Sequence, residues 1–321
     1  MLRIHFTGAD LARTRLAPEP DPLWELCLSI HQLRTRRGEV TLSDWRTAVS
    51  EALRPGDPAR ADVDLVLQVN PPVGYFPDFL TPPDGWLGFE AGVQEGLRTP
   101  QHLVRRDLDR LAQHGRPGSD VVDLQAAGGM AALGRALDRY RQVALDPFWE
   151  RVRAAVEADL AQRRQLLAHS GVEGLLDGLG PSIRWSGGVL EIADYRADRD
   201  VSLDGRGITL IPSYFKAAGR PISLADPELP PVLVYPVDRL TTGVGRPGAL
   251  AELIGRTRAS VLEAAAQGGT TGEVARRLGI SAASASQHMS VLRGAGLVLS
   301  VREGNRVRHL PTTLGRAFLN G

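Results

Sequence analysis

The sequence contains a single cysteine, Cys27, a single lysine, Lys216, and no apolar run of membrane-spanning length. One cysteine excludes an intramolecular disulfide and a multi-cysteine zinc site, and it fits a reducing compartment. Charges interrupt the apolar residues of the opening MLRIHFTGADLARTRL, so we expect no signal peptide. We therefore expect a soluble, cytoplasmic protein without a membrane partner, with Cys27 as a buried structural thiol.

Motifs of catalysis are also missing. The seven histidines are scattered, and the chain has no HExxH pair, GxSxG elbow or Walker loop. Gly128, Gly129 and Gly134 follow neither of the usual phosphate-loop spacings. Distant residues can converge in space, so an enzyme fused to a binding module stays open as an alternative. The leading expectation is a protein that is not an enzyme and needs no cofactor.

Positive charge is concentrated at the C-terminal end, although the whole chain carries a net charge of only +1. From Leu250 onward there are nine arginines and four glutamates, a net charge of +5, which leaves −4 for the rest. This asymmetry favours a polyanion surface, such as one for DNA, on the C-terminal segment alone.

The length of 321 residues favours two domains. We expect a mainly helical α+β fold in three parts. Residues 1–240 form an N-terminal regulatory and dimerisation domain, helical over 1–180 and with a small antiparallel sheet over 181–240. Residues 241–249, rich in Gly and Pro, form a linker. Residues 250–321 form a winged helix-turn-helix.

Periodicity and turn residues place the elements of the N-terminal domain. The expected helices cover 22–34, 43–53 with Ser43 as cap, 89–97, 100–113, 124–143 and 147–168, with a turn or short helix from Asp10 to Leu16. Residues 63–69 form a short strand or helical turn. The expected strands are 2–6 and 232–237, with hairpins over 182–192 and 201–211. The aromatic loop 71–83 caps the core or, alternatively, walls a ligand pocket.

The stretch from Thr270 to Pro311 has the layout of a helix-turn-helix followed by a two-stranded wing. A helix that starts near Leu250 ends at Gly268-Gly269. Thr270 or Thr271 caps a helix over 271–278, Gly279 ends it with a positive φ, and Ser281 caps the recognition helix 282–294. Ala285, Met289 and Leu292 recur at i, i+4 and i+7 and form its buried stripe.

The remaining side chains of this segment suit a DNA duplex. Small residues permit a close approach to the major groove, Gln287 can bond a base edge, and the helix start and the wing arginines suit phosphates. The candidate DNA-binding residues are Thr271, Ser281, Ala283, Ser284, Ser286, Gln287, His288, Arg293, Arg302, Arg306 and Arg308. Two alternatives remain, a winged helix used only for protein contacts and, for His288, a half-buried structural role.

The segment ISAASASQHMSVLRGAGLV resembles the recognition helix of the ArsR/SmtB family of bacterial transcriptional regulators. It follows that family's pattern at Ser281, Ser286, His288, Leu292, Ala295, Gly296, Leu297 and Val298, with Met289 in place of the usual Leu. LRIHFTGADLARTR and PLWELCLSIHQLR are similar to the N-terminal domain of a poorly characterised group of regulators that carry this module.

The resemblance implies a dimeric, operator-binding protein, often a repressor that is released by an effector. We expect it to bind a short inverted repeat in double-stranded DNA as a homodimer. Thr271–Leu278 contains no Cys or His, and the final helix, 312–319, lacks the carboxylate and His ligands of zinc-sensing members, so we expect no metal site. A small-molecule effector, if one exists, binds in the N-terminal domain or at its junction with the winged helix.

Overall fold

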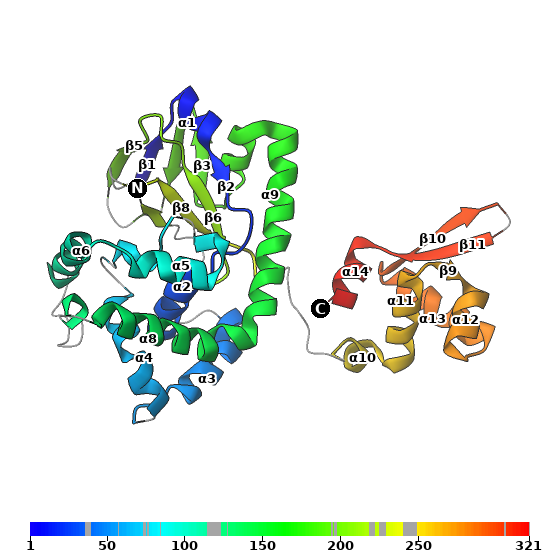
Figure 1. Ribbon diagram of the computed structural model, residues 1–321. Coiled ribbons are helices and arrows are strands. Elements are labelled where there is room, and N and C mark those ends of the chain that lie inside the picture. The colour runs from blue at the N-terminus through cyan, green and yellow to red at the C-terminus, as the bar shows by residue number, and fades with distance from the viewer. Residues whose placement is uncertain are drawn as a thin grey trace. The chain divides into compact units, whose positions relative to one another are not determined.

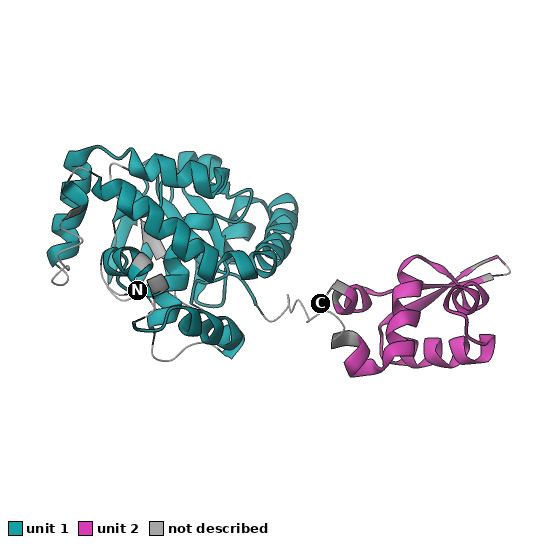
Figure 2. Cartoon of the chain, turned by 60° about the horizontal axis from the view of Figure 1, so that its bottom comes forward, with its two compact units in different colours: residues 1–240 teal, residues 241–321 magenta. Residues whose placement is uncertain are grey.

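The computed structural model divides into two compact units, Met1–Leu240 (unit 1) and Thr241–Gly321 (unit 2), which Figure 2 colours separately. It describes all residues except 36–39, 57, 73–74, 76, 84, 114–122, 127, 194, 196–197, 218–221, 225–228, 240–248, 305 and 321. The linker expected at 241–249 therefore lies almost wholly outside the described residues. The expected class, a mainly helical α+β fold with a C-terminal helix-turn-helix, is confirmed.

Helices make up most of unit 1 and pack around α2 (Figure 1). Trp24, Leu26, Cys27 and Ile30 of α2 are all buried, so the expectation for the Cys27 thiol is confirmed, and burial raises its pKa. The helices are α1 (Gly8–Arg13), α2 (Pro22–Arg34), α3 (Ser43–Ala52), α4 (Pro58–Val69), α5 (Phe89–Leu97), α6 (Gln101–Gln113), α8 (Gly129–Ala144) and α9 (Trp149–Asp177). Short 3-10 turns are η1 (Val40–Leu42), η2 (Asp78–Leu80), η3 (Gly85–Leu87), η4 (Asp123–Gln125) and η5 (Asp146–Phe148).

Two four-stranded sheets complete unit 1, in the orders β3-β4-β1-β5 and β2-β6-β8-β7. The strands are β1 (Leu2–His5), β2 (Arg15–Leu16), β3 (Ile183–Ser186), β4 (Val189–Ile192), β5 (Arg199–Ser202), β6 (Thr209–Ser213), β7 (Ile222–Leu224) and β8 (Val232–Pro236). The long helix α9 contacts both β3 and β6 (Figure 1). Leu175 and Leu176 near its C-terminal end belong to the sheet core, together with Ile4 and Leu190.

The sheets differ from the small antiparallel sheet that the sequence predicts. β1 pairs with β5, β2 with β6 and β6 with β8 in parallel, so both sheets are mixed. The second predicted hairpin is wrong, because the chain turns at Asp204 (φ 55°) and Gly205 (φ 80°) from β5 in one sheet to β6 in the other. Residues 183–192 do form a hairpin around Gly187 and Gly188, as expected.

Several helix expectations also need correction. Residues 63–69 belong to a full helix, α4, because Pro58 begins it and Val63, Val66 and Val69 share a buried face. The short helix expected from Asp10 to Leu16 begins earlier, as α1, with Thr7 as its N-cap and Asp10 as the third residue of its capping box. Leu42 occupies the N-cap position of α3, and α9 continues past 168 across a break at Gly171 (φ 67°).

The buried carboxyl group of Glu25 attaches α2 to the end of β6. The Glu25 side chain accepts hydrogen bonds from the backbone N–H groups of Tyr214 (2.7 Å) and Phe215 (3.0 Å) and from the Ser213 hydroxyl (2.9 Å). The Gln32 amide donates to the Phe215 carbonyl at 3.0 Å. These bonds satisfy polar groups that would otherwise be orphaned in the core, so they fix how helix and sheet meet.

Asp21 begins the same helix. Its Oδ1 accepts from the backbone N–H groups of Leu23 (3.0 Å) and Trp24 (3.1 Å), which is an N-cap arrangement. Its Oδ2 is buried against Gly85, where an added Cβ would lie only 2.5 Å from that oxygen. The close approach therefore requires glycine at position 85.

Unit 2 contains α10 (Ala249–Ile254), α11 (Arg256–Ala266), β9 (Gly269–Thr270), α12 (Thr271–Leu278), α13 (Ala282–Gly294), β10 (Val298–Glu303), β11 (Arg306–Pro311) and α14 (Thr313–Asn320). The single helix expected from Leu250 to Gly268 is wrong, because Gly255 (φ 87°) separates α10 from α11. The sheet has a third strand that the sequence did not predict, in the order β10-β11-β9. Val261, Leu262, Val274, Met289 and Leu292 form the core.

Candidate nucleic-acid interface

Local capping sets the two helices of the helix-turn-helix at the predicted residues. Thr270 caps α12 in a reciprocal capping box with Glu273, and Gly279 ends it in the left-handed conformation (φ 65°). Ser281 then caps α13, where its Oγ accepts from the backbone N–H of Ser284 at 3.1 Å. The short turn between these caps fixes the direction in which α13 leaves α12.

The buried stripe of α13 is the one that its spacing predicts. Ala285, Met289 and Leu292 are at most 1% exposed. The opposite face is exposed and carries small side chains together with two long ones, Gln287 and Arg293. This face consists of Ala283, Ser286, Gln287, Ser290 and Arg293. A helix with such a face can approach a groove closely and place one amide at a base edge.

The other candidates from the helices are only partly accessible. Ser281 is exposed, whereas Ser284 and His288 are half-buried. Thr271 is half-buried as well, and its Oγ1 lies 2.9 Å from Nε2 of His309 on β11. Thr271 therefore connects α12 to the wing through this hydrogen bond.

The wing (β10 and β11) places its arginines on opposite faces. Arg302 pairs with Val307 and shares a face with the Ser300–His309 pair, whereas Arg308 pairs with Val301 on the other face. The side chain of Arg306 and the tip residue Asn305 lie outside the described residues. The three predicted wing arginines therefore do not form one cationic surface by themselves.

The contacts of these arginines differ accordingly. The Arg293 guanidinium of α13 lies 3.5 Å from Ser300 Oγ, so Arg293, Ser300 and Arg302 follow one another from the recognition helix onto the wing. The Arg308 guanidinium instead lies over Gly268, with Nη2 at 3.2 Å from the position of an added Cβ. The candidate cationic strip is thus Arg293 and Arg302, and Arg308 packs beside the turn after α11.

His309 is a buried connector that the sequence reasoning did not single out. It is 4% exposed, and its ring bridges two hydroxyls, Thr271 Oγ1 at Nε2 and Ser300 Oγ at Nδ1, both at 2.9 Å. A neutral imidazole suits this position, because one ring nitrogen donates and the other accepts. The alternation of side chains along a strand places His309 on the face opposite to exposed Arg308. This alternation could have predicted from the sequence that His309 is buried.

Burial first, and the Arg293 charge second, lower the pKa of His309 below its ordinary value. Burial also lowers the pKa of His31, to about 4, so a proton NMR titration of the full chain should show more than one imidazole below about 6.5. We expect one of these signals to be missing in His309→Gln and the His31 signal to remain. Because the folded-state pKa is depressed, the stability from this bridge is complete above about pH 6.5 and is lost as pH falls through the folded pKa. An imidazole at position 309 that titrates at or above 6.5 would contradict the assignment.

Comparison with known families agrees with this architecture. A family model described as a helix-turn-helix domain matches residues 253–301, which run from the end of α10 into β10. A second, described as a family of unknown function (DUF5937), matches residues 129–241, which include α8, α9 and strands β3 to β8. No curated protein and no solved structure gave a match.

The C-terminal unit therefore contains a helix-turn-helix domain, preceded by a DUF5937 region. Helix-turn-helix domains are the DNA-binding part of many transcription regulators, and the match supports that class for this chain. No helix in the described part of the chain is long and apolar enough to cross a membrane.

Proposed function

We propose that this protein is a sequence-specific transcription regulator of the ArsR/SmtB type, a repressor that binds an inverted-repeat operator as a homodimer and has no enzymatic role. The observation that carries the proposal is the exposed face of α13. That face is small and polar around Gln287, and a wing with an exposed arginine, Arg302, adjoins its C-terminal end.

In this proposal α13 enters the major groove. Ala283 and Ser286 allow a close approach to the base edges, and the Gln287 amide pairs with one base, with adenine as its preferred partner. Ser281 accepts the backbone N–H of Ser284, so its hydroxyl proton stays available to donate to a phosphate oxygen at the helix start. Arg293 and Arg302 neutralise phosphates beside the groove.

A homodimer is supported by apolar surface on the first and last helices of unit 2. Leu253 on α10 is 71% exposed and Leu314 on α14 is 51% exposed, although both are large aliphatic side chains. A second copy that covers them would bury this surface. Two recognition helices related by a two-fold axis would then read two half-sites about one helical turn apart.

The test is a footprint with the full chain on the DNA upstream of its own gene. We expect protection of one short inverted repeat that survives an excess of random competitor DNA. Equal affinity for upstream and random DNA would refute a sequence-specific regulator. Analytical ultracentrifugation of the complex separates a dimer from a monomer on each site.

Replacing Gln287 by Ala is expected to weaken operator binding by roughly 1–3 kcal/mol and to relax the preference at one base position. The side chain is exposed, so the fold should be unaffected. The measurement is binding selection on random DNA followed by sequencing, for both proteins. Gln267→Ala, at an exposed position just after α11, is the matched control and should leave the selected sequence unchanged.

A further inference from the structure

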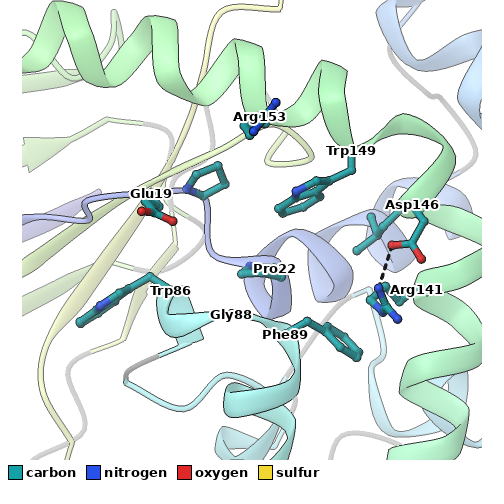
Figure 3. Close-up of a pocket in the computed structure, with 11 residues that line it drawn as sticks. Glu19, Pro22, Trp86, Gly88, Phe89, Arg141, Asp146, Trp149 and Arg153 are labelled. Carbon is teal, nitrogen blue, oxygen red and sulfur yellow. Dashed lines mark hydrogen bonds and ion pairs between the residues drawn. The ribbon is translucent and has the colours of Figure 1, made fainter.

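Unit 1 contains an open pocket of about 270 Å³ at the junction of several helices (Figure 3). Its walls come from distant parts of the chain, namely the segment before α2, the stretch from η3 to α5, and the α8–α9 junction. Phe89 (7% exposed) and Leu145 (1% exposed) are held in the core and border it. Trp86 and Trp149 add two large, half-buried rings.

The two arginines of the pocket are already neutralised. Arg141 pairs with Asp138 (2.9 Å) and with Asp146 (3.1 Å), and Glu90 lies 4.0 Å from it. Its guanidinium also lies 4.7 Å from the centre of the Phe89 ring. These carboxylates compensate its charge, although the buried Nε–H of Arg141 has no hydrogen-bond partner among the described residues.

Arg153, at the other side of the pocket, is in a similar position. It pairs with Glu150 (2.5 Å), and Glu157 lies 3.9 Å away. Together with Asp138, Asp146 and Glu90, five carboxylates therefore surround the two guanidinium groups. Among these ion-pair partners alone, the carboxylates outnumber the guanidinium groups.

Glu19 adds a carboxylate that no other charge compensates. It is exposed, lines the pocket next to Pro20, and makes no hydrogen bond or ion pair with any described residue. The Pro18 carbonyl, next to it in the chain, accepts a hydrogen bond from Arg164 at 2.9 Å. A pocket with aromatic walls and an unpaired carboxylate has the chemistry that recognises an organic cation.

We propose that this pocket binds a compact organic cation with an apolar or aromatic body, such as a quaternary ammonium compound. The rings of Trp86 and Trp149 contact the body and the cationic centre, and Glu19 supplies the opposite charge. The proposal of a cation-binding site depends only on the residues of this pocket. A role as the effector site of a DNA-binding repressor rests, in addition, on the function proposed above.

The test uses benzyltrimethylammonium, titrated into the full chain without DNA and followed by calorimetry and tryptophan fluorescence. We expect saturable binding with quenched fluorescence. Phenylacetate, which carries a similar ring and the opposite charge, should bind at least roughly tenfold more weakly. If phenylacetate binds as well or better, the charge assignment is wrong. If neither compound binds, the pocket is not a site for this class of ligand.

Variants locate the binding. Glu19→Gln should lower the affinity for the cation by roughly five- to tenfold. Trp149→Leu should also lower this affinity and should remove part of the fluorescence quenching. Glu173→Gln, an exposed and equally unpaired glutamate near the end of α9, is the control and should have no effect. Equal losses in Glu19→Gln and Glu173→Gln would refute the site. Repeating the footprint with the cation present then tests the effector role separately, because binding itself is measured without DNA.

Discussion

Replacing Glu25 by Ala is expected to lower the free energy of unfolding of unit 1 by about 3–5 kcal/mol at pH 6. The substitution leaves two backbone N–H groups, those of Tyr214 and Phe215, and the Ser213 hydroxyl without their acceptor in a buried place. Each buried group without a partner costs about 1–3 kcal/mol. The attachment of α2 to β6 should loosen as a result.

Urea unfolding followed by tryptophan fluorescence measures this effect in unit 1 alone. The five tryptophans, Trp24, Trp45, Trp86, Trp149 and Trp185, all lie in unit 1. Glu51→Ala, at an exposed position on α3, is the control and should change stability by no more than about 0.5 kcal/mol. Similar midpoints for the two variants would show that the Glu25 bonds contribute nothing.

The same carboxyl predicts a pH dependence. Burial raises the pKa of Glu25 from 4.5 to about 7, and burial likewise raises the pKa of Asp21 from 3.8 to about 6. Between the unfolded and folded pKa values the folded state holds the extra proton, so the stability of unit 1 should fall as pH rises from about 4.5 to 7. The stability of Glu25→Ala should fall less over this range. The difference in free energy of unfolding between this variant and the wild type should therefore be smaller at pH 8 than at pH 6.

The double substitution of Arg293 and Arg302 by Ala is expected to weaken DNA binding by roughly 100-fold at low salt. If each arginine contacts one phosphate, the slope of log K against log[salt] should also become shallower by about two. Because these contacts are to the backbone of DNA, operator and random sequences should lose affinity alike. Fluorescence anisotropy at several salt concentrations, with a labelled duplex, provides both quantities.

Arg308→Ala is the matched control for this pair. Its guanidinium lies over Gly268, on the opposite face of the wing from Ser300. We expect a smaller loss of affinity and little change in salt slope. If Arg308→Ala alone reduces the salt slope by about one, the value expected for each arginine of the pair, the two faces of the wing contribute equally and the assignment of the cationic strip is wrong.

The helix-turn-helix could be predicted almost residue by residue because its signals are local. Ser281 and Gly279 determine helix ends through their own side chain or φ, and the spacing of Ala285, Met289 and Leu292 shows which face is buried. None of these features depends on a partner far away in the sequence. The candidate DNA-contacting face of α13 follows from the same spacing.

The strand pairing of the sheets and the contacts of the wing could not be predicted from local sequence signals. β5 and β6 look like a hairpin around Asp204-Gly205. However, β5 pairs with β1, and β6 pairs with β2 and β8, which local spacing does not reveal. The direction of the Arg308 side chain depends on a turn about forty residues earlier. Glu25 looks like a surface residue of α2, and only the end of β6 gives it a buried role.

The placement of β1 has a consequence for how the chain folds as it is synthesised. β1 lies between β4 and β5, whose residues follow it by more than 180 positions, so its sheet cannot close until they have left the ribosome. At typical elongation rates that delay is on the order of 10–40 s. During this time Leu2 and Ile4, both at most 1% exposed in the finished sheet, lack their partners. Unit 1 should therefore fold late and slowly for its size, and its nascent chain should depend on chaperones during the delay.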